Sequence, residues 1–593
     1  MRDISDHARV ALAFALALLV MVGWYFLNPP KPQPPPGSAI AQHATNAPAG
    51  AGAPITQPSQ AVVAGSTGAT SVAPVVAAGE KNIVVESDLY RVELSNRGGV
   101  VRSWQLKKFT DEGNPPRTLD LVNADLARQT NGWPLSLQLA DQQLESAANQ
   151  SLYVVKATSD GRVTDTDSTI AAPAQVEFHW SDGKLNVTKT LKFDRSYIIG
   201  VETSVQQSGS PASYSVAWRG GFGDVTAFRA ATQTLVFDGR DGSVSTITSK
   251  NVGAPNQRNV SAEVPGTFSA AGLEDLYFAA AFLPAEPPPG QPVPDVLTLS
   301  ARQATHTLQS DGKTTQEILP EMAVGSTSPG PLALRLYVGP KDIDLLKTVR
   351  PPLNGLVQFG WFGVIAEPLF YILRWIYHYL PNYGWAIVAM TVGINMLLYP
   401  LKVKSWRSMQ KMQKVAPEIR SIQDRYKKYS MRDPRKQEMN KEVMEVYNRE
   451  GVNPMGSCLP QVIQMPIWFG LYRMLNATIE LRHAPWFGPF HDLAGRDPYF
   501  ILTISMAILM YAAQKMTPMT VTDPSQQRMM TLMPLMFTGM FFLIPVSSGL
   551  ILYIVTQNIM AVIQQWHLNR SSPLKAPPPL RGKKQVARAA LSK

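Results

Sequence analysis

Apolar and polar positions follow two different patterns along the chain. Residues 10–27 and several stretches beyond residue 384 are long apolar runs, whereas residues 81–346 alternate apolar and polar side chains over short segments. Apolar runs of about 20 residues can cross a bilayer as helices, and a period of two is typical of strands with one buried face. The pattern therefore predicts membrane helices near both ends of the chain and a β domain between them in the sequence.

The N-terminal apolar run, residues 10–27, carries no charge and follows two arginines. A signal peptide and an uncleaved anchor share this pattern. The nearest small-residue cleavage pattern, Ala-Ile-Ala at 39–41, lies well beyond the run, which favours an anchor with residues 1–9 in the cytoplasm. Residues 28–80 are rich in Pro, Ala and Gly and hold few large apolar side chains, so we expect a disordered linker outside the cytoplasm.

The alternating region, residues 81–346, contains a clear hairpin signal. In "NIVVESDLYRVELSNRGGVVRSWQL" two alternating runs flank Arg97-Gly98-Gly99, and "VTKTLKFDRSYIIGVETSV" and "LALRLYVG" show the same period. We expect an all-β sandwich, which the anchor places outside the cytoplasm. Its two histidines, His179 and His306, lie far apart in the sequence, so a folded domain without an active site is the favoured interpretation.

The C-terminal part of the chain holds the remaining apolar runs. The predicted spans are residues 384–401, 457–477, 499–513, 529–543 and 550–566. Residues 356–380 are apolar enough to span but contain Glu367, Arg374 and His378. If this segment spanned, the strongly basic stretch after the next span would lie outside the cytoplasm, so we predict an interfacial amphipathic helix instead. With the anchor, the prediction is a polytopic α-helical membrane protein of six spans, with a five-span core at 384–566 and both chain ends in the cytoplasm.

Positive charge gathers on the predicted cytoplasmic side. The net charge is +11; residues 401–450 hold fourteen Lys/Arg against seven Asp/Glu, and the tail, 567–593, holds seven Lys/Arg and no acid. Apolar positions at helical spacing on both sides of "SMRDPRK" predict a helical hairpin at 402–450. Its basic residues include Lys402, Lys404, Arg407, Lys411, Lys414, Arg420, Arg425, Lys427 and Lys428. A solvated surface and an electrostatic contact with anionic lipid or RNA both fit this pattern.

Signals of covalent chemistry are missing from the sequence. Cys458 is the single cysteine, which excludes an intrachain disulfide and a cysteine metal cluster, and the eight histidines show no HExxH spacing. Nucleotide-binding loops and a serine-hydrolase elbow are also missing. The sequence therefore predicts no catalytic residue, no metal and no cofactor.

Polar side chains form stripes on three of the predicted spans. They are Thr391 and Asn395; Gln461, Gln464, Trp468 and Tyr472; and Tyr553 and Gln557, with Thr556 beside them. Steps of three and four residues place side chains on one helix face. Hydrogen bonds between helices are one explanation, and a shared hydrophilic groove that opens to the cytoplasm is the other. None of these residues is a carboxylate suited to a proton relay, so an ion-coupled pump is disfavoured.

Several long motifs follow one another through the chain. They are "YPLKVKSWRSMQKMQKVAPEI", "GVNPMGSCLPQVIQMPIW", "ELRHAPW", "HDLAGRDPYFIL", "QKMTP" and "SSGLILYIVTQN". Together with "NRGGVVRSWQL", "DLYFAAAFLP" and "LYVGPKD" they resemble the YidC membrane protein insertase family, in its Gram-negative form with a large periplasmic domain. The resemblance implies an insertase and not an enzyme. Such a protein places hydrophobic segments of nascent membrane proteins into the inner membrane, alone or with the Sec translocon, and helps them fold.

The resemblance also bears on the outer domain and on partners. It implies a periplasmic domain similar to a sugar-mutarotase supersandwich. The basic hairpin and tail are then expected to contact the ribosome and anionic lipids. Two rival functions remain: a small-solute transporter, which would show inverted repeats and broken helices, and a sugar enzyme, which would need clustered His and Glu in a cleft.

The chain departs from the family pattern inside the predicted groove. The family commonly has an arginine five residues before the Pro of "YPL", where this chain has Asn395. Ile554 stands where the family often has a second tyrosine. Arg473 is a candidate replacement cation, or an arginine that extends to the outer interface. We interpret Asn395 as a groove amide that binds water or polar groups of the substrate without a net charge.

Overall fold

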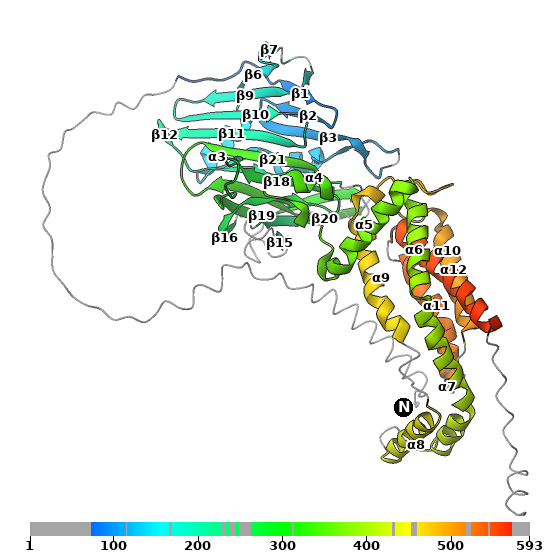
Figure 1. Ribbon diagram of the computed structural model, residues 1–593. Coiled ribbons are helices and arrows are strands. Elements are labelled where there is room, and N and C mark those ends of the chain that lie inside the picture. Colours follow the sequence, from blue (N-terminus) through cyan, green and yellow to red (C-terminus); the bar gives the residue numbers. More distant parts are fainter. Residues whose placement is uncertain are drawn as a thin grey trace, which may run out of the picture. The chain divides into compact units, whose positions relative to one another are not determined.

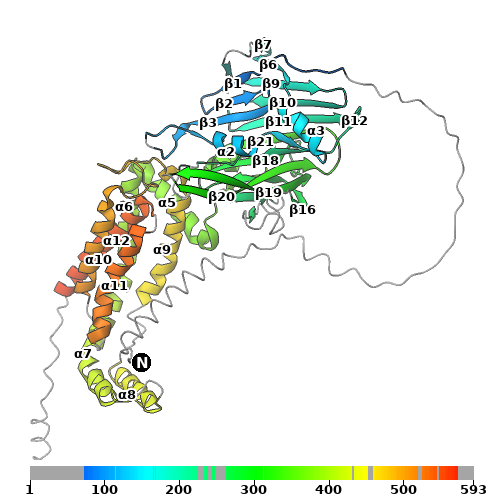
Figure 2. The ribbon, with the colours of Figure 1, turned by 180° about the vertical axis from the view of Figure 1, so that it is seen from behind.

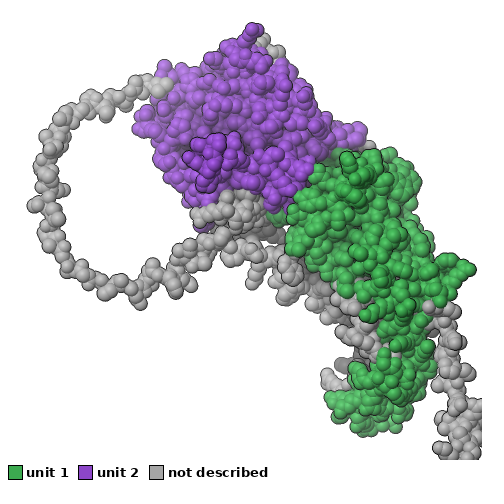
Figure 3. Space-filling model, viewed as in Figure 1, with its two compact units in different colours: residues 1–22, 358–593 green, residues 23–357 purple. Residues whose placement is uncertain are grey.

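A computed structural model of the chain describes residues 73–113, 115–164, 166, 169–224, 226, 233–237, 244–247, 262–310, 313–429, 433–451, 459–517, 524–543 and 546–571. The chain divides into two compact units, one within residues 23–357 and one that includes residues 358–593 (Figure 3). The predicted anchor at 10–27, most of the linker and most of the tail lie outside the described residues.

The first unit is rich in strands. They are β1 (Asn82–Glu86), β2 (Tyr90–Ser95), β3 (Val100–Thr110), β4 (Thr118–Asp120), β5 (Ser136–Gln138), β6 (Val154–Ser159), β7 (Arg162–Thr164), β8 (Ile170–Ala171), β9 (Ala174–Ser181), β10 (Leu185–Phe193), β11 (Ile198–Gln207), β12 (Ser210–Pro211), β13 (Ser215–Trp218), β14 (Gln233–Phe237), β15 (Val244–Ile247), β16 (Ala262–Phe268), β17 (Ala270–Glu274), β18 (Phe278–Pro284), β19 (Leu297–Ser310), β20 (Lys313–Ser326) and β21 (Leu332–Pro340). Three short helices accompany them: α2 (Ala124–Thr130), α3 (Gln142–Gln150) and α4 (Ile343–Thr348).

These strands form three sheets (Figures 1 and 2). The largest has the order β15-β14-β17-β18-β21-β11-β10-β9-β6-β7, with β12 beside β11; the others are β4-β3-β2-β1-β8 and β16-β19-β20-β13-β5. Strand β17 of the largest sheet packs against β19 and β20, which brings two sheets face to face. The β-sandwich prediction is confirmed, although "all-β" overlooks the three short helices.

Strand β10 shows how the alternating pattern builds the core. Every second side chain points inward and is buried, and these are Leu185, Val187, Lys189, Leu191 and Phe193. A period of two allows one face of a strand to be apolar. Lys189 interrupts that face, so its charge has to be satisfied inside the domain.

The ammonium of Lys189 is held by three backbone carbonyls. It donates hydrogen bonds to Gly98 (2.7 Å), Gly99 (3.2 Å) and Leu135 (2.7 Å). The two glycines have φ of 77° and 56° and form the predicted hairpin turn between β2 and β3. A Cβ on Gly98 would lie 2.4 Å from the carbonyl oxygen of Asn149, so glycine is required there. Complete burial lowers the pKa of Lys189 to about 7.

The second unit is helical. Its helices are α5 (Gly363–Tyr379), α6 (Tyr383–Leu397), α7 (Tyr399–Arg425), α8 (Arg435–Arg449), α9 (Leu459–Ala477), α10 (Ile501–Met516), α11 (Pro524–Leu543) and α12 (Ser548–Ser571). Helix α12 packs against α6, α9 and α10, while α5 packs against α6 and α9 (Figures 1 and 2). Close approach depends on small residues: a Cβ on Gly470 of α9 would lie 2.9 Å from the Ile365 side chain of α5.

Helices occupy the five predicted C-terminal spans, but they differ in length and hydropathy. Among the described helices, one segment, Pro498–Met516, is by itself long and apolar enough to cross a membrane. A second qualifies if α6 and α7, which meet at an angle of 52°, count as one span. Pro400 lies at this junction and cannot donate a backbone hydrogen bond, which explains the bend. The count of six spans remains a prediction.

Helix α5 lies within the predicted interfacial segment, 356–380. One side is buried in the unit, at Ala366, Leu369, Phe370 and Leu373. The opposite side exposes large apolar groups, with Val364 at 87%, Trp375 at 64% and Tyr379 at 66% of their surface. This division between a buried face and an exposed aromatic face is compatible with an interfacial helix.

The predicted helical hairpin consists of α7 and α8 and has a core of its own. This core is formed by Val415, Ile419, Ile422 and Val446, with Tyr426, Met439, Val443 and Tyr447 packed around it. Ion pairs of 2.6 Å join Arg425 to Glu442 and Arg449 to Glu418 across the two helices. The apolar spacing in α8 also includes Met444. This side chain is 51% exposed and lies outside the hairpin core.

Candidate functional site

Helix α6 carries two polar side chains into the interior of the helical unit. Thr391 and Asn395 are both fully buried. The Thr391 hydroxyl donates to the carbonyl of Ile387 (2.7 Å), so its polarity is satisfied within its own helix. The Asn395 Nδ2 group donates to the carbonyl of Thr391 (2.9 Å), which leaves the Asn395 Oδ1 atom as an acceptor.

Lys402 supplies the donor for this acceptor. Its Nζ atom lies 2.8 Å from Asn395 Oδ1 and 3.0 Å from Gln564 Oε1. Gln564 Nε2 in turn donates to the backbone carbonyl of Asn395 (3.2 Å). Asn395, Lys402 and Gln564 therefore link α6, α7 and α12, and we call these three residues the polar junction.

Helix geometry explains why Lys402 reaches Asn395. Asn395 lies in the last turn of α6 and Lys402 in the first turn of α7, on either side of the 52° bend between the two helices. A helical side chain is directed toward the N-terminus of its helix, so the Lys402 stem extends back past Pro400 toward α6. Among the described residues, no carboxylate lies within ion-pair distance of Lys402, and neutral amide oxygens hold the cation.

A second polar contact joins α12 to α9. The Tyr553 side chain is buried, and its phenol group interacts with the Gln464 side chain. One turn beyond Gln464, the rings of Trp468 and Tyr472 stack with their centroids 6.0 Å apart. Gln464 and Trp468 are half-buried, whereas Tyr472 is exposed. The polar stripe of α9 thus extends from the interior of the unit to its surface.

The remaining predicted groove residues differ from one another. The Thr556 hydroxyl donates to the carbonyl of Leu552 (2.8 Å), as Thr391 does within α6. Gln557 is half-buried. The Gln461 side chain lies outside what the structure describes. Both explanations offered by the sequence therefore stay open, because some stripe residues bond within one helix and others bond between helices.

Arg473, the candidate replacement cation, lies elsewhere. A Cβ placed on Gly360 would be 2.7 Å from Arg473 Nη2, so the guanidinium packs directly against this glycine. Gly360 begins the short 3₁₀ turn Gly360–Phe362 that precedes α5, and Arg473 lies near the C-terminal end of α9. Arg473 therefore takes no part in the polar junction.

Two members of the polar junction were not assigned to the groove from the sequence. The sequence places Lys402 in the basic hairpin because this lysine follows the predicted span, and it does not single out Gln564. The missed signal is a repeat of seven: Lys402 is seven residues after Asn395, and Gln564 is seven residues after Gln557. Two turns of a helix return a side chain to almost the same face.

The other basic residues of the hairpin point outward. Lys404, Arg407, Lys411 and Lys414 are exposed at steps of three and four along α7, and Arg420, Arg425, Lys427 and Lys428 are exposed further on. Arg425 is neutralised by Glu442. Lys428 and Arg435 lie 5.2 and 4.2 Å from the centre of the Tyr429 ring. The hairpin thus presents a stripe of cations beside its apolar core.

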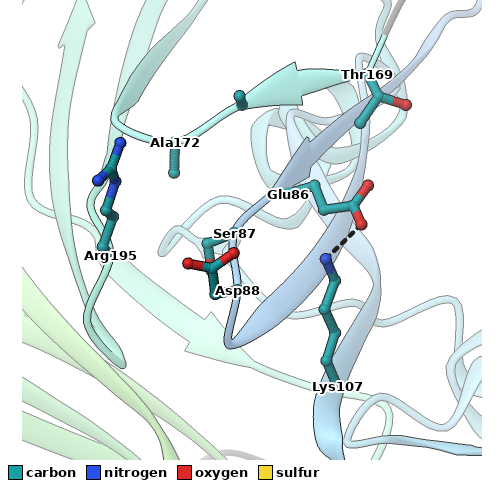
Figure 4. A pocket seen from close by; sticks show the side chains of 8 residues that line it. Glu86, Ser87, Asp88, Lys107, Thr169, Ala172 and Arg195 are labelled. Carbon is teal, nitrogen blue, oxygen red and sulfur yellow. Dashed lines mark ion pairs between the residues drawn. The ribbon is translucent and has the colours of Figure 1, made fainter.

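The β unit contains a polar cleft of about 400 Å³ (Figure 4). Glu86, Ser87, Asp88, Lys107, Thr169, Ala171, Ala172 and Arg195 line it. Lys107 and Glu86 form an ion pair, and no histidine lines the cleft. His179 is instead bonded to Asn186 (2.9 Å) on the neighbouring strand. Among the described residues, no group of His, Cys, Asp and Glu could hold a metal ion. These observations give the rival sugar enzyme no support.

Fold and site together describe a chain in which a helical unit with polar contacts in its interior accompanies a β-sandwich domain. Residues 375–575 match the model of the family described as 60Kd inner membrane protein, and residues 82–372 match that of the YidC periplasmic domain.

Known relatives extend over nearly the whole chain. The membrane protein insertase YidC of Geobacter metallireducens is 32% identical over 575 residues, which cover 95% of this chain and 98% of the relative. That of Maridesulfovibrio salexigens is 30% identical, with coverages of 95% and 99%. A crystal structure of an active YidC insertase aligns with 86% of this chain and 96% of its own, at 16% identity and a TM-score of 0.34. The chain belongs to the YidC family of membrane protein insertases.

Proposed function

We propose that this chain inserts hydrophobic segments of newly made proteins into the inner membrane through a hydrophilic groove between α6, α9 and α12. Membership of the insertase family supports the activity. The observation that supports the route is the polar junction, because buried polar groups are rare in a membrane helix bundle unless they serve packing or passage. The groove would comprise Thr391, Asn395, Gln461, Gln464, Trp468, Tyr472, Tyr553 and Gln557, together with Lys402 and Gln564.

The proposed mechanism is physical and needs no covalent step. A charged side chain costs about 2.5–3.5 kcal/mol at the centre of a membrane helix on insertion scales. A groove that is wet from the cytoplasm shortens the hydrocarbon path that the polar flank of a substrate must cross. The apolar segment then leaves the groove for lipid, which is favourable by roughly 25 cal/mol per Å² of apolar surface removed from water. We propose no catalytic residue for this chain.

Further partners follow from charge. The hairpin stripe and the basic tail would contact ribosomal RNA or anionic lipid headgroups, since both are polyanions. For the hairpin and tail to make these contacts, both ends of the chain lie in the cytoplasm and the β-sandwich lies in the periplasm. Cooperation with the Sec translocon is part of the same proposal.

Depletion tests the proposed function directly. Cells in which this chain is depleted should fail to insert a small test membrane protein, and purified chain in proteoliposomes should restore insertion, followed as protease protection of the translocated flank. A transporter would restore solute uptake and leave insertion unchanged. Normal insertion after complete depletion would contradict the proposal.

A further inference from the structure

Two neighbouring helices, α10 and α12, expose the same series of side chains. On each helix two isoleucines, one aromatic residue and one cation follow at steps of four, three and four residues. Such steps keep the side chains on one helix face. The members are Ile504, Ile508, Tyr511 and Lys515, which we call the α10 stripe, and Ile559, Ile563, Trp566 and Arg570, which we call the α12 stripe. The isoleucines and aromatic residues are 38–64% exposed, and both cations are exposed. Each stripe is therefore an outward face that passes from apolar through aromatic to positively charged.

The charged ends of the two stripes lie at a contact between the helices. Helices α10 and α12 pack against each other (Figures 1 and 2). The side-chain amides of Gln565 and Asn569 on α12 both donate to the backbone carbonyl of Met516, each at 3.3 Å. Lys515 directly precedes Met516, and Arg570 directly follows Asn569. These hydrogen bonds hold the last turns of both helices together, so both cations lie at the same end of the helical unit.

The two cations have aromatic neighbours and no acidic ones. Lys515 Nζ lies 5.7 Å from the centre of the Tyr511 ring, and the guanidinium of Arg570 lies 5.4 Å from that of Trp566. Neither cation belongs to an ion pair within the part of the chain that the structure describes. The sequence of residues 524–593 contains no Asp or Glu. Both positive charges are therefore available to an external anion.

We propose that the α10 and α12 stripes bind an anionic phospholipid, with its phosphate at Lys515 and Arg570 and its acyl chains along the isoleucines. Charge complementarity and the order of the side chains support this occupant, because tyrosine and tryptophan favour the level of lipid headgroups. A soluble anion would leave the isoleucines uncovered, and a neutral lipid would leave the cations without a counter-charge. The site is separate from the polar junction and the basic hairpin. In the proposed orientation of the chain it lies in the cytoplasmic leaflet.

Lipid binding to the full-length chain in neutral detergent, measured by native mass spectrometry, tests the proposal. The probes are dioleoyl phosphatidylglycerol, which is anionic, dioleoyl phosphatidylcholine, which has the same acyl chains, and glycerophosphate, which has none. The double variant Lys515→Gln with Arg570→Gln removes both charges, whereas Lys515→Arg with Arg570→Lys keeps them. Lys156→Gln with Lys184→Gln is the matched control, because both lysines are exposed in the β unit and the net charge changes equally.

The double Gln variant should bind phosphatidylglycerol about thirtyfold more weakly than wild type, the order expected for two basic residues near a membrane surface. Its affinity for phosphatidylcholine should change less than about twofold, since neither charge acts on a neutral lipid. The charge-preserving swap and the lysine control should keep the wild-type affinity for phosphatidylglycerol. Glycerophosphate should bind at least about tenfold more weakly than the whole lipid, because it covers no apolar surface. Equal wild-type affinity for both lipids, the same loss in the lysine control, or glycerophosphate bound as tightly as phosphatidylglycerol would overturn the proposal.

Two further readings keep the test decisive if the double Gln variant does not fold. The wild-type preference for phosphatidylglycerol should fall several-fold between about 50 and 500 mM ammonium acetate, because salt screens exposed charges, and a preference that salt leaves unchanged contradicts the proposal. The same spectra report oligomeric state. A folded variant that loses a dimer and keeps its lipid affinity would show that the stripes join copies of this chain instead. Insertion activity is not needed for these measurements, so they stand even if the proposed insertase function fails.

Discussion

Lys189 should make the stability of the β-sandwich depend on pH. Its folded-state pKa is lowered by burial to about 7, from an ordinary 10.5. Between these two values the unfolded chain binds more protons than the folded one, so the free energy of unfolding rises with pH. The stabilisation is complete above about pH 10.5 and is lost progressively as the pH falls to about 7. At 1.36 kcal/mol per pH unit the upper limit is roughly 5 kcal/mol.

The hydrogen bonds of Lys189 determine how much of this maximum stabilisation the folded domain gains. Three carbonyl acceptors favour the charged form and oppose the effect of burial, so we expect a slope below about 1.4 kcal/mol per pH unit. Tyr153 and Tyr214 have pKa values raised by burial. The unfolded tyrosines ionise near pH 10, and stability falls again above that value. The effect of Lys189 on the free energy of unfolding is therefore best measured between about pH 7 and about pH 9.5.

The assay is urea unfolding of residues 73–357 across this window, followed by tryptophan fluorescence. Lys189→Met should remove the rise in unfolding free energy with pH, although it also leaves three carbonyls without their donor, at about 1–3 kcal/mol each. Lys156→Met, at an exposed position of β6, is the control and should keep the wild-type slope. Equal slopes in wild type and Lys189→Met would refute the reasoning.

Three further predictions concern function. Asn395→Leu removes an acceptor of Lys402 and should lower the free energy of unfolding of the full chain in detergent by about 1.5–3 kcal/mol. Asn395→Arg alone should also destabilise the chain, because its guanidinium would lie beside the Lys402 ammonium. If both variants melt at the wild-type temperature, the contacts of the polar junction do not stabilise the helical unit. Removal of residues 81–349, a cut chosen to leave no part of β20 or β21 behind, should leave insertion largely intact if the β-sandwich is a scaffold, and complete loss in a correctly oriented truncation would show otherwise. Co-sedimentation of the basic hairpin and tail with ribosomes should weaken at least tenfold between about 50 and 200 mM salt, whereas binding indifferent to salt would exclude an electrostatic contact.

The sequence predicts elements better than it predicts their partners. The alternation over residues 81–346 and the turn at Gly98-Gly99 predict a β-sandwich with one defined hairpin, because burial on one face of a strand imposes a period of two. The order of the strands in the three sheets does not follow from that period, since it depends on contacts such as β11 with β21. Lys189 shows the same limit: its inward position could be read from the period, but its three carbonyl partners come from distant parts of the chain.

The candidate site was predictable to a similar extent. Polar spacing identified Asn395, Gln464 and Tyr553, because steps of three and four residues reveal a helix face. The spacing cannot say whether a side chain bonds within its helix, as Thr391 does, or with a residue of another helix, as Asn395 does with Lys402. The sequence assigns Lys402 to the cytoplasmic basic hairpin, because a lysine is costly inside a membrane span and usually marks its end. The long stem that carries its charge back into the bundle appears only in three dimensions.

The continuity of α7 gives the polar junction a mechanical connection to the cytoplasmic hairpin. One helix, Tyr399–Arg425, contains both Lys402 and the core residues Val415, Ile419 and Ile422. From Lys402 to Val415 the helix rises about 20 Å, over which the backbone hydrogen bonds form a stiff rod. A partner that pushes or rotates the hairpin therefore also moves the Lys402 ammonium relative to Asn395 and Gln564. Docking at the hairpin would therefore be coupled mechanically to the polar junction.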